Sequence, residues 1–79
     1  MKVLYFAQAA TVAGCREEEW TMEGIRSLED FWAEAIRRHP GLSALRSQSR
    51  VAAGHRYVGP QDSLSGSEEV AVIPPVSGG

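Results

Sequence analysis

The sequence predicts an α+β domain in which a mixed sheet of about five strands packs on one main helix. Apolar, β-forming runs lie near both ends of the chain, at residues 3–7 and 70–73, and a single stretch with helical periodicity lies between them at residues 28–39. A chain of 79 residues has room for one hydrophobic core and no second domain. The elements are therefore expected to share that core.

Residues 3–7 (Val-Leu-Tyr-Phe-Ala) form an unbroken apolar run, which predicts a central strand covered at least in part on both faces. Tyr5 and Phe6 point to opposite faces, so one is expected in the core and the other on a surface open to a partner. Residues 8–14 are expected to form a short helical turn or loop that ends in a left-handed cap at Gly14.

Residues 16–22 alternate in polarity and predict a second strand. Glu18, Trp20 and Met22 fall on one face, and Trp20 and Met22 are expected to point inward. The run Glu17-Glu18-Glu19 is interpreted as charge that protects an edge strand from pairing with other chains. We do not interpret it as a metal or catalytic site.

Residues 28–39 give the clearest prediction, an amphipathic helix. Ser27 and Asp30 form a capping box at its start, and Pro40-Gly41 ends it. The basic residues 37–39 match the negative end of the helix dipole. The stripe that faces the core is Leu28, Phe31, Trp32, Ala35 and Ile36.

The segment after the helix predicts an irregular turn over residues 42–49, followed by a β-hairpin. The hairpin joins residues 50–53 to 56–58 through Gly54-His55, with glycine first, as a type II′ turn requires. Residues 61–68 are polar and anchored by Leu64. The last strand, residues 69–73, is ended by Pro74-Pro75.

The element order is strand, strand, helix, strand, short strand, strand, and it predicts a β-grasp (ubiquitin-like) fold. The first and last strands are the most apolar, so they are expected to be parallel neighbours at the sheet centre. One helix covers one sheet face, which leaves Ala71 and Ile73 on the other as the predicted partner interface. Residues 1–73 are assigned to the β-grasp domain and residues 74–79 to an extended C-terminal tail.

Composition excludes several classes of function. The formal net charge of −2 is unlike the basic footprint of a nucleic-acid binder, and no apolar run approaches membrane-spanning length. The N-terminus lacks a secretory signal, so we expect a cytoplasmic protein with neither nucleic-acid nor membrane partners. Cys15 is the only cysteine, which excludes an internal disulfide.

No metal site is predicted from the histidines and the single cysteine, which show no recognisable ligand spacing. His39 is expected to interact with the end of the helix, and His55 with solvent at the turn. Arg16 beside Cys15 is expected to lower the thiol pKa slightly. We expect this thiol to be structural or incidental.

The tail Pro74-Pro75-Val76-Ser77-Gly78-Gly79 directly follows the last strand. Gly78 and Gly79 have no side chain, so they fit a passage too narrow for other residues and leave the terminal carboxylate unhindered. The two prolines favour an extended chain. This ending, together with residues 2–8 (Lys-Val-Leu-Tyr-Phe-Ala-Gln), resembles the family of molybdopterin synthase small subunits over the whole chain.

The resemblance implies a sulfur carrier whose chemistry occurs at Gly79. An ATP-dependent adenylating enzyme would activate this carboxylate, which then becomes a thiocarboxylate and gives sulfur to cyclic pyranopterin monophosphate, forming the molybdopterin dithiolene. The tail from Pro74 to Gly78 would thread into the partners. The family implies a heterotetramer with the large synthase subunit, in which this chain binds no cofactor and is not catalytic alone.

Two positions depart from the family pattern. Ala10-Thr11 stands where the family usually has Arg-Glu, and Gly66-Ser67-Glu68 stands where Asp-Gly-Asp is common. Two alternatives remain open: a sulfur carrier for another acceptor, such as thiamine or a thiolated tRNA, and a ubiquitin-like binding module whose tail is never activated.

Overall fold

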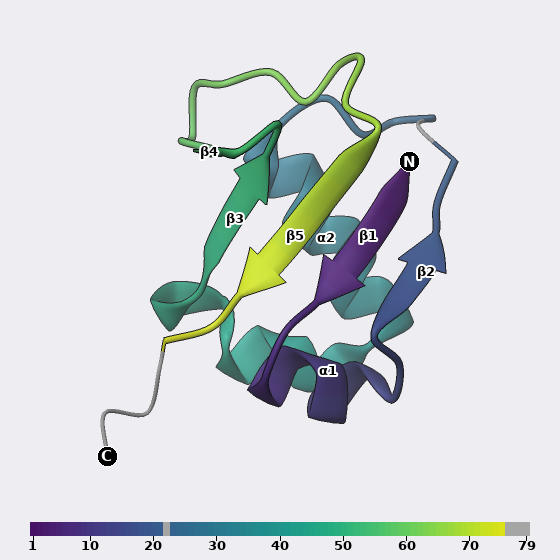
Figure 1. The fold of residues 1–79 in the computed structure, drawn as a ribbon, viewed down its shortest axis with the longest axis vertical. Coiled ribbons are helices and arrows are strands. Elements are labelled where there is room, and N and C mark those ends of the chain that lie inside the picture. Colours follow the sequence, from purple (N-terminus) through teal and green to yellow (C-terminus); the bar gives the residue numbers. More distant parts are fainter. Residues whose placement is uncertain (22, 76–79) are drawn as a thin grey trace.

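The computed structural model describes residues 1–21 and 23–75. Along the chain it contains β1 (Lys2–Tyr5), α1 (Gln8–Ala13), β2 (Glu17–Glu19), α2 (Leu28–Arg38), the 3₁₀ helices η1 (Pro40–Ala44) and η2 (Arg46–Gln48), β3 (Arg50–Ala53), β4 (Arg56–Tyr57) and β5 (Glu69–Ile73). The predicted succession of strands around one main helix is confirmed (Figure 1).

The five strands form one mixed sheet in the order β2-β1-β5-β3-β4. β1 and β5, from opposite ends of the chain, are parallel neighbours at its centre, with Val3 opposite Val70 and Tyr5 opposite Val72. The other three pairings are antiparallel. The β-grasp prediction is therefore confirmed.

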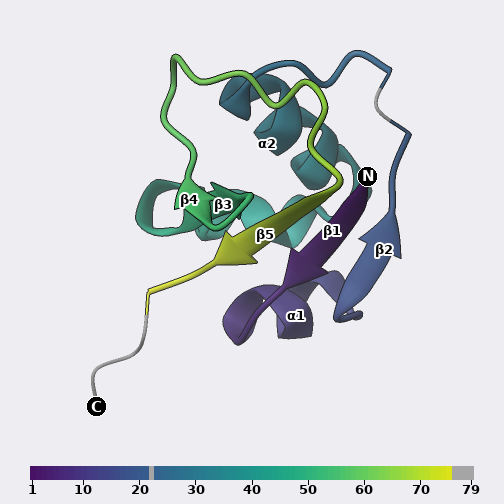
Figure 2. The same ribbon diagram turned by 45° about the horizontal axis from the view of Figure 1, so that its top comes forward.

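α2 covers one face of the sheet (Figure 2), and the hydrophobic core lies between them. The centre of the sheet contributes Val3, Val70 and Val72, all fully buried. Trp20 stacks on Phe31 of α2 with 5.0 Å between ring centroids. Leu64 is also fully buried, and its backbone N–H donates to the carbonyl of Arg26, which attaches the polar loop before β5 to the start of α2.

The capping box predicted for α2 is present. The Ser27 hydroxyl accepts from the backbone N–H of Asp30 at 3.1 Å, and the Asp30 carboxylate accepts from the backbone N–H of Ser27 at 3.2 Å. The helix ends at Arg38, one residue earlier than predicted, and His39 is its C-cap. Pro40 then begins η1.

Local backbone geometry corrects three predicted boundaries and one turn type. β1 ends at Tyr5 because Ala7 takes a positive φ of 50° before α1. The strand predicted over residues 16–22 is shorter and covers Glu17–Glu19. In place of the irregular turn predicted over residues 42–49, the chain forms the end of η1 and the whole of η2. Gly54 and His55 both have positive φ, 59° and 66°, so the hairpin turn is type I′ instead of type II′.

Among the described residues, no helix combines the length and apolar character needed to cross a bilayer.

Candidate functional site

The sheet face opposite α2 carries a row of side chains contributed by four strands. Leu4 in β1 lies opposite Ala71 in β5, Ala71 lies opposite Ala52 in β3, and Ala52 lies opposite Tyr57 in β4. The two central positions are alanines, so the row is low in the middle and bounded by larger side chains. We call this surface the open face, lined by Leu4, Phe6, Ala52, Tyr57, Ala71 and Ile73.

The open face is hollowed, with a volume of about 1020 Å³. Phe6 and Tyr57 at its margins are 48% and 59% exposed, although both are aromatic. The guanidinium of Arg50 lies 5.0 Å from the centroid of the Tyr57 ring, and Arg50 is opposite Ile73 in the sheet. The hollow has an apolar floor on the sheet, and polar side chains of the loop before β5, such as Asp62, Ser65 and Glu68, form part of its wall. A broad hollow of this mixed character with exposed aromatics suits a protein surface better than an enclosed substrate pocket.

β5 leads directly into the tail at Pro74. Its side chains alternate, with Val70 and Val72 buried under α2 while Ala71 and Ile73 are partly exposed on the open face, as predicted. Pro74 is buried and Pro75 is exposed. The remaining tail positions, Val76, Ser77, Gly78 and the predicted reacting residue Gly79, lie outside the described residues. The base of the tail is thus fixed to the central strand of the domain.

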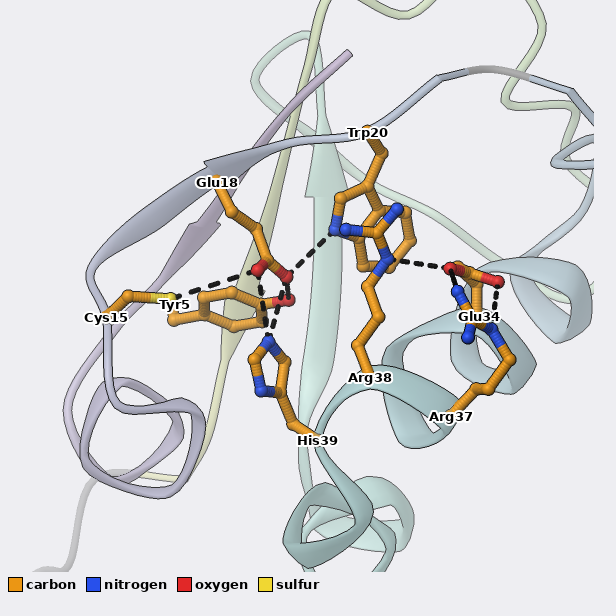
Figure 3. Close-up of polar contacts among 8 residues, drawn as sticks. All are labelled: Tyr5, Cys15, Glu18, Trp20, Glu34, Arg37, Arg38 and His39. Carbon is orange, nitrogen blue, oxygen red and sulfur yellow. Dashed lines mark hydrogen bonds and ion pairs between the residues drawn. The ribbon is translucent and has the colours of Figure 1, made fainter.

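A second cluster of polar side chains lies on the helix side of the sheet (Figure 3). Glu18 is at its centre: one carboxylate oxygen, Oε2, accepts from the Tyr5 hydroxyl at 2.5 Å and from Trp20 Nε1 at 2.9 Å. His39 Nε2 lies 2.9 Å from Oε2 and 3.1 Å from Oε1, and Cys15 Sγ lies 4.0 Å from Oε1. We call Tyr5, Cys15, Glu18, Trp20 and His39 the Glu18 cluster.

The surroundings of Glu18 act on its pKa in opposite directions. Burial alone raises the pKa of the carboxyl, but hydrogen bonds with Tyr5, Trp20 and His39 outweigh burial and hold the pKa below its ordinary value. Burial and then Glu18 raise the pKa of Tyr5 far above its ordinary range, so this phenol remains a donor. Burial, followed by repulsion from Glu18, also raises the pKa of Cys15.

The Glu18 cluster corrects one prediction about an individual residue and adds to another. The pKa of Cys15 was expected to fall because of Arg16, and that expectation is wrong because burial and Glu18 raise it. His39 was expected to interact with the helix end; it is the C-cap of α2, and its side chain also contacts Glu18 in β2. The alternation in β2 did place Glu18 on the same face as buried Trp20, which was the available signal that this glutamate points inward.

Edge-strand protection remains a sound interpretation of the other two glutamates in the run. β2 lies at the edge of the sheet, and Glu17 and Glu19 are exposed. The N-terminal ammonium binds the Glu19 carboxylate at 2.8 Å. Glu18 alone turns inward.

Comparison with known proteins gives consistent relationships across the chain. The ThiS family matches residues 3–79. The molybdopterin synthase sulfur carrier subunit of Chlamydomonas reinhardtii is 41% identical, and the alignment covers 100% of this chain and 98% of that protein. The human protein of the same name is also 41% identical, with 100% of this chain and 93% of that protein covered.

Solved structures show the same fold. A structure of SAMP1 from Haloferax volcanii has a TM-score of 0.82 and 26% identity, covering 99% of this chain and 97% of that one. A putative molybdopterin converting factor, subunit 1, from Pyrococcus furiosus has a TM-score of 0.80 and 29% identity, with 95% of each chain covered. The chain therefore belongs to the ThiS family and, within it, to the sulfur carrier subunits of molybdopterin synthase.

Proposed function

We propose that this chain carries sulfur on the carboxylate of Gly79 and delivers it inside the large subunit of molybdopterin synthase. The observation that carries the proposal is the ending Pro-Pro-Val-Ser-Gly-Gly, placed directly after a central strand in a chain that is 41% identical to sulfur carrier subunits. The tail and the open face supply the two things that a carrier needs, a reactive end and a surface for its partners.

Activation begins at a poor electrophile. A carboxylate resists attack because its charge is delocalised, so an ATP-dependent activating enzyme first converts it into an acyl-adenylate, with pyrophosphate as the leaving group. The outer sulfur of a persulfide then attacks the acyl carbon, and AMP leaves. A thiol cleaves the resulting S–S bond, which leaves a thiocarboxylate on Gly79.

Delivery requires the tail to enter the partner's active site. Gly78 and Gly79 have no side chains to obstruct a narrow channel. Pro74 and Pro75 restrict the chain to extended conformations, which lowers the conformational entropy lost on docking. The acceptor is cyclic pyranopterin monophosphate, and the groups that catalyse transfer belong to the large subunit.

The open face is the proposed docking surface for these partners. Ala71 and Ile73 lie on it immediately before the tail, so a protein bound there is positioned to receive Gly79. Its hollow centre and aromatic margins suit a partner with a complementary apolar ridge. Two carrier chains and two large subunits would form the heterotetramer.

Intact-mass analysis tests the proposal directly. The purified chain is incubated with ATP, an activating enzyme and a sulfur source, and a mass gain equal to the difference between sulfur and oxygen is expected. Fragmentation should place that gain on Gly79, and a chain ending in a carboxamide should gain nothing. No gain under conditions that load a known carrier would contradict the proposal.

The acceptor is tested separately. The loaded chain is mixed with the large subunit and the pyranopterin, and loss of the thiocarboxylate should accompany dithiolene formation. Transfer to a thiamine precursor or to tRNA instead would favour the alternative acceptors. A chain that binds its partners but is never loaded would be a ubiquitin-like binding module.

A further inference from the structure

We propose that Cys15, Glu18 and His39 bind one Zn²⁺ ion, with a fourth coordination position open to solvent or an exogenous ligand. The three residues come from the α1–β2 connection, β2 and the C-cap of α2, and the fold brings them together at one end of the sheet (Figure 3). The site differs from the open face and from the tail, and it does not depend on the proposed sulfur transfer.

The potential ligand atoms already converge. Cys15 Sγ, a Glu18 carboxylate oxygen and a His39 ring nitrogen all lie within 4.8 Å of one another. In a tetrahedral zinc site with bonds of about 2.0–2.3 Å, ligand atoms are roughly 3.3–3.7 Å apart. Inward side-chain shifts of about 1 Å would therefore suffice to complete the coordination geometry.

The donor set selects the kind of ion. One sulfur, one imidazole nitrogen and one carboxylate oxygen match the preferences of Zn²⁺, whereas Ca²⁺ and Mg²⁺ prefer oxygen ligands throughout. A thiolate and a carboxylate together neutralise the charge of a divalent ion, and the imidazole binds as a neutral ligand. The thiol loses its proton to solvent as the Zn–S bond forms.

The neighbouring side chains hold the ligands in place without occupying the site. Tyr5 and Trp20 both donate to Glu18 Oε2, so Oε1, which faces His39 and Cys15, is available to the ion. The Tyr5 ring also packs edge-on against the His39 imidazole, with 5.5 Å between centroids. Hydrogen bonds that orient a carboxylate ligand in this way are typical of metal sites.

The site is accessible, and the arginine next to His39 in the sequence, Arg38, is already paired. The side chains of His39 and Glu18 are 18% and 21% exposed, so an ion can enter from solvent. The guanidinium of Arg38 binds Glu34 at 2.6 Å and lies over the Trp20 ring. A bound ion would replace the direct contact between His39 and Glu18 and fasten the α1–β2 connection to the end of α2.

The test uses the full chain with Zn²⁺ alone, followed by Co²⁺ as a spectroscopic substitute. Calorimetric titration should show one Zn²⁺ per chain, and Co²⁺ should give a thiolate-to-metal charge-transfer band together with the visible absorption of a tetrahedral site. Cys15→Ala should abolish the charge-transfer band and weaken Zn²⁺ binding at least tenfold, since changes even to the residues that support ligands cost about 10–100-fold. His39→Gln should weaken binding similarly.

The matched control is His55→Gln, which removes the other histidine of the chain at an exposed turn and should leave affinity and spectra unchanged. Cys15→Ala keeps the contacts of Glu18 with Tyr5, Trp20 and His39, so it tests the site even if His39→Gln unfolds the chain. The absence of saturable one-to-one binding would overturn the proposal, as would equal Zn²⁺ affinity in the wild type and Cys15→Ala.

Discussion

Leu4 in β1 lies directly opposite Ala71 in β5, in parallel register, so residues 67 positions apart (71 − 4) form the centre of the open face. Ala52 in β3 lies on the other side of Ala71. β5 is paired on both sides, with β1 and β3, and central strands are among the most stable parts of a sheet. The tail therefore begins at a rigid strand. The surface proposed to bind partners thus includes the strand that leads directly into the tail proposed to react.

Ile73→Glu is expected to weaken binding to the large synthase subunit at least tenfold, which corresponds to about 1.4 kcal/mol. The substitution places a charge on the open face next to the tail, and docking would have to desolvate that charge. Direct titration of the large subunit measures the effect. Ala33→Glu adds the same charge on an exposed position of α2 and should leave the affinity unchanged. Wild-type affinity for Ile73→Glu would remove the open face from the interface.

Deleting Gly78 and Gly79 is expected to abolish sulfur loading and transfer while leaving the fold intact. In the part of the chain that the structure describes, the core cluster and all five strands lie at or before Ile73, so the thermal unfolding midpoint should match that of the full chain. Thiocarboxylate formation is followed by mass spectrometry and dithiolene formation by the complete synthase assay. Retained activity in the truncated chain would refute the role of Gly79.

Features set by neighbouring residues could be predicted from the sequence. The capping box of Ser27 and Asp30 lies within one turn of helix, and the alternation of β5 needs only successive residues to assign its two faces. The parallel pairing of β1 with β5 followed from their apolar character and the long connection between them. These predictions are confirmed because local propensity and burial agree in these elements.

Features that depend on distant residues or on backbone details were not predicted. Glu18 and His39 are 21 positions apart, and no spacing rule links them, yet the packing of α2 on the sheet brings them into contact. The pKa of Cys15 depends on burial that a sequence neighbour such as Arg16 does not reveal. The hairpin turn differs from prediction because His55 takes a positive φ, which is uncommon for a residue with a side chain.

Tyr5→Phe is expected to reduce the free energy of unfolding by about 1.5–3 kcal/mol, the usual contribution of a hydrogen bond to a charged group. The substitution keeps the buried ring and removes the only hydroxyl that donates to Glu18 among the described contacts. Urea denaturation at neutral pH provides the measurement. Tyr57→Phe removes the hydroxyl of an exposed tyrosine and should change stability by less than about 0.5 kcal/mol. Equal effects of the two substitutions would contradict a structural role for the Glu18 hydrogen bonds.

Stability is expected to fall as the pH is lowered from about 4.5 toward 2, in part because of Glu34. Hydrogen bonds with Arg37 and then Arg38 lower the pKa of this carboxyl from 4.5 to about 2. Because the folded-state pKa is below the unfolded-state value, the unfolded chain binds more protons in this range, so the stabilisation is present above it and lost on acidification.

Glu34→Gln tests this dependence. The variant should lose less stability than the wild type between about pH 5 and pH 2.5, which is roughly the pH range in which the paired carboxylate takes up its proton. The effect should be modest, since the Arg37 guanidinium is largely exposed and solvent screens the pair. Glu29→Gln removes an exposed carboxylate from the same helix and leaves the pairs of Glu34 with both arginines intact. An unchanged pH dependence in Glu34→Gln would show that other groups account for the acid response.

Gly41→Ala is expected to destabilise the fold through one contact with α1. A Cβ atom at position 41 would lie 2.7 Å from Val12 Cγ1, closer than real Cβ contacts allow, so the Val12 side chain would have to change rotamer or η1 and α1 would have to move apart. We expect a loss of about 1 kcal/mol in the free energy of unfolding, the low end of the range for overpacked sites. Val12→Ala alone should cost less stability, because Val12 is 40% exposed.

A double-mutant cycle measured by urea denaturation gives the coupling energy between the two positions. In the Val12→Ala background the clashing methyl group is absent, so adding Gly41→Ala should cost less than about 0.5 kcal/mol. If Gly41→Ala costs the same in both backgrounds, the glycine is required for its backbone and not for the close approach of η1 to α1.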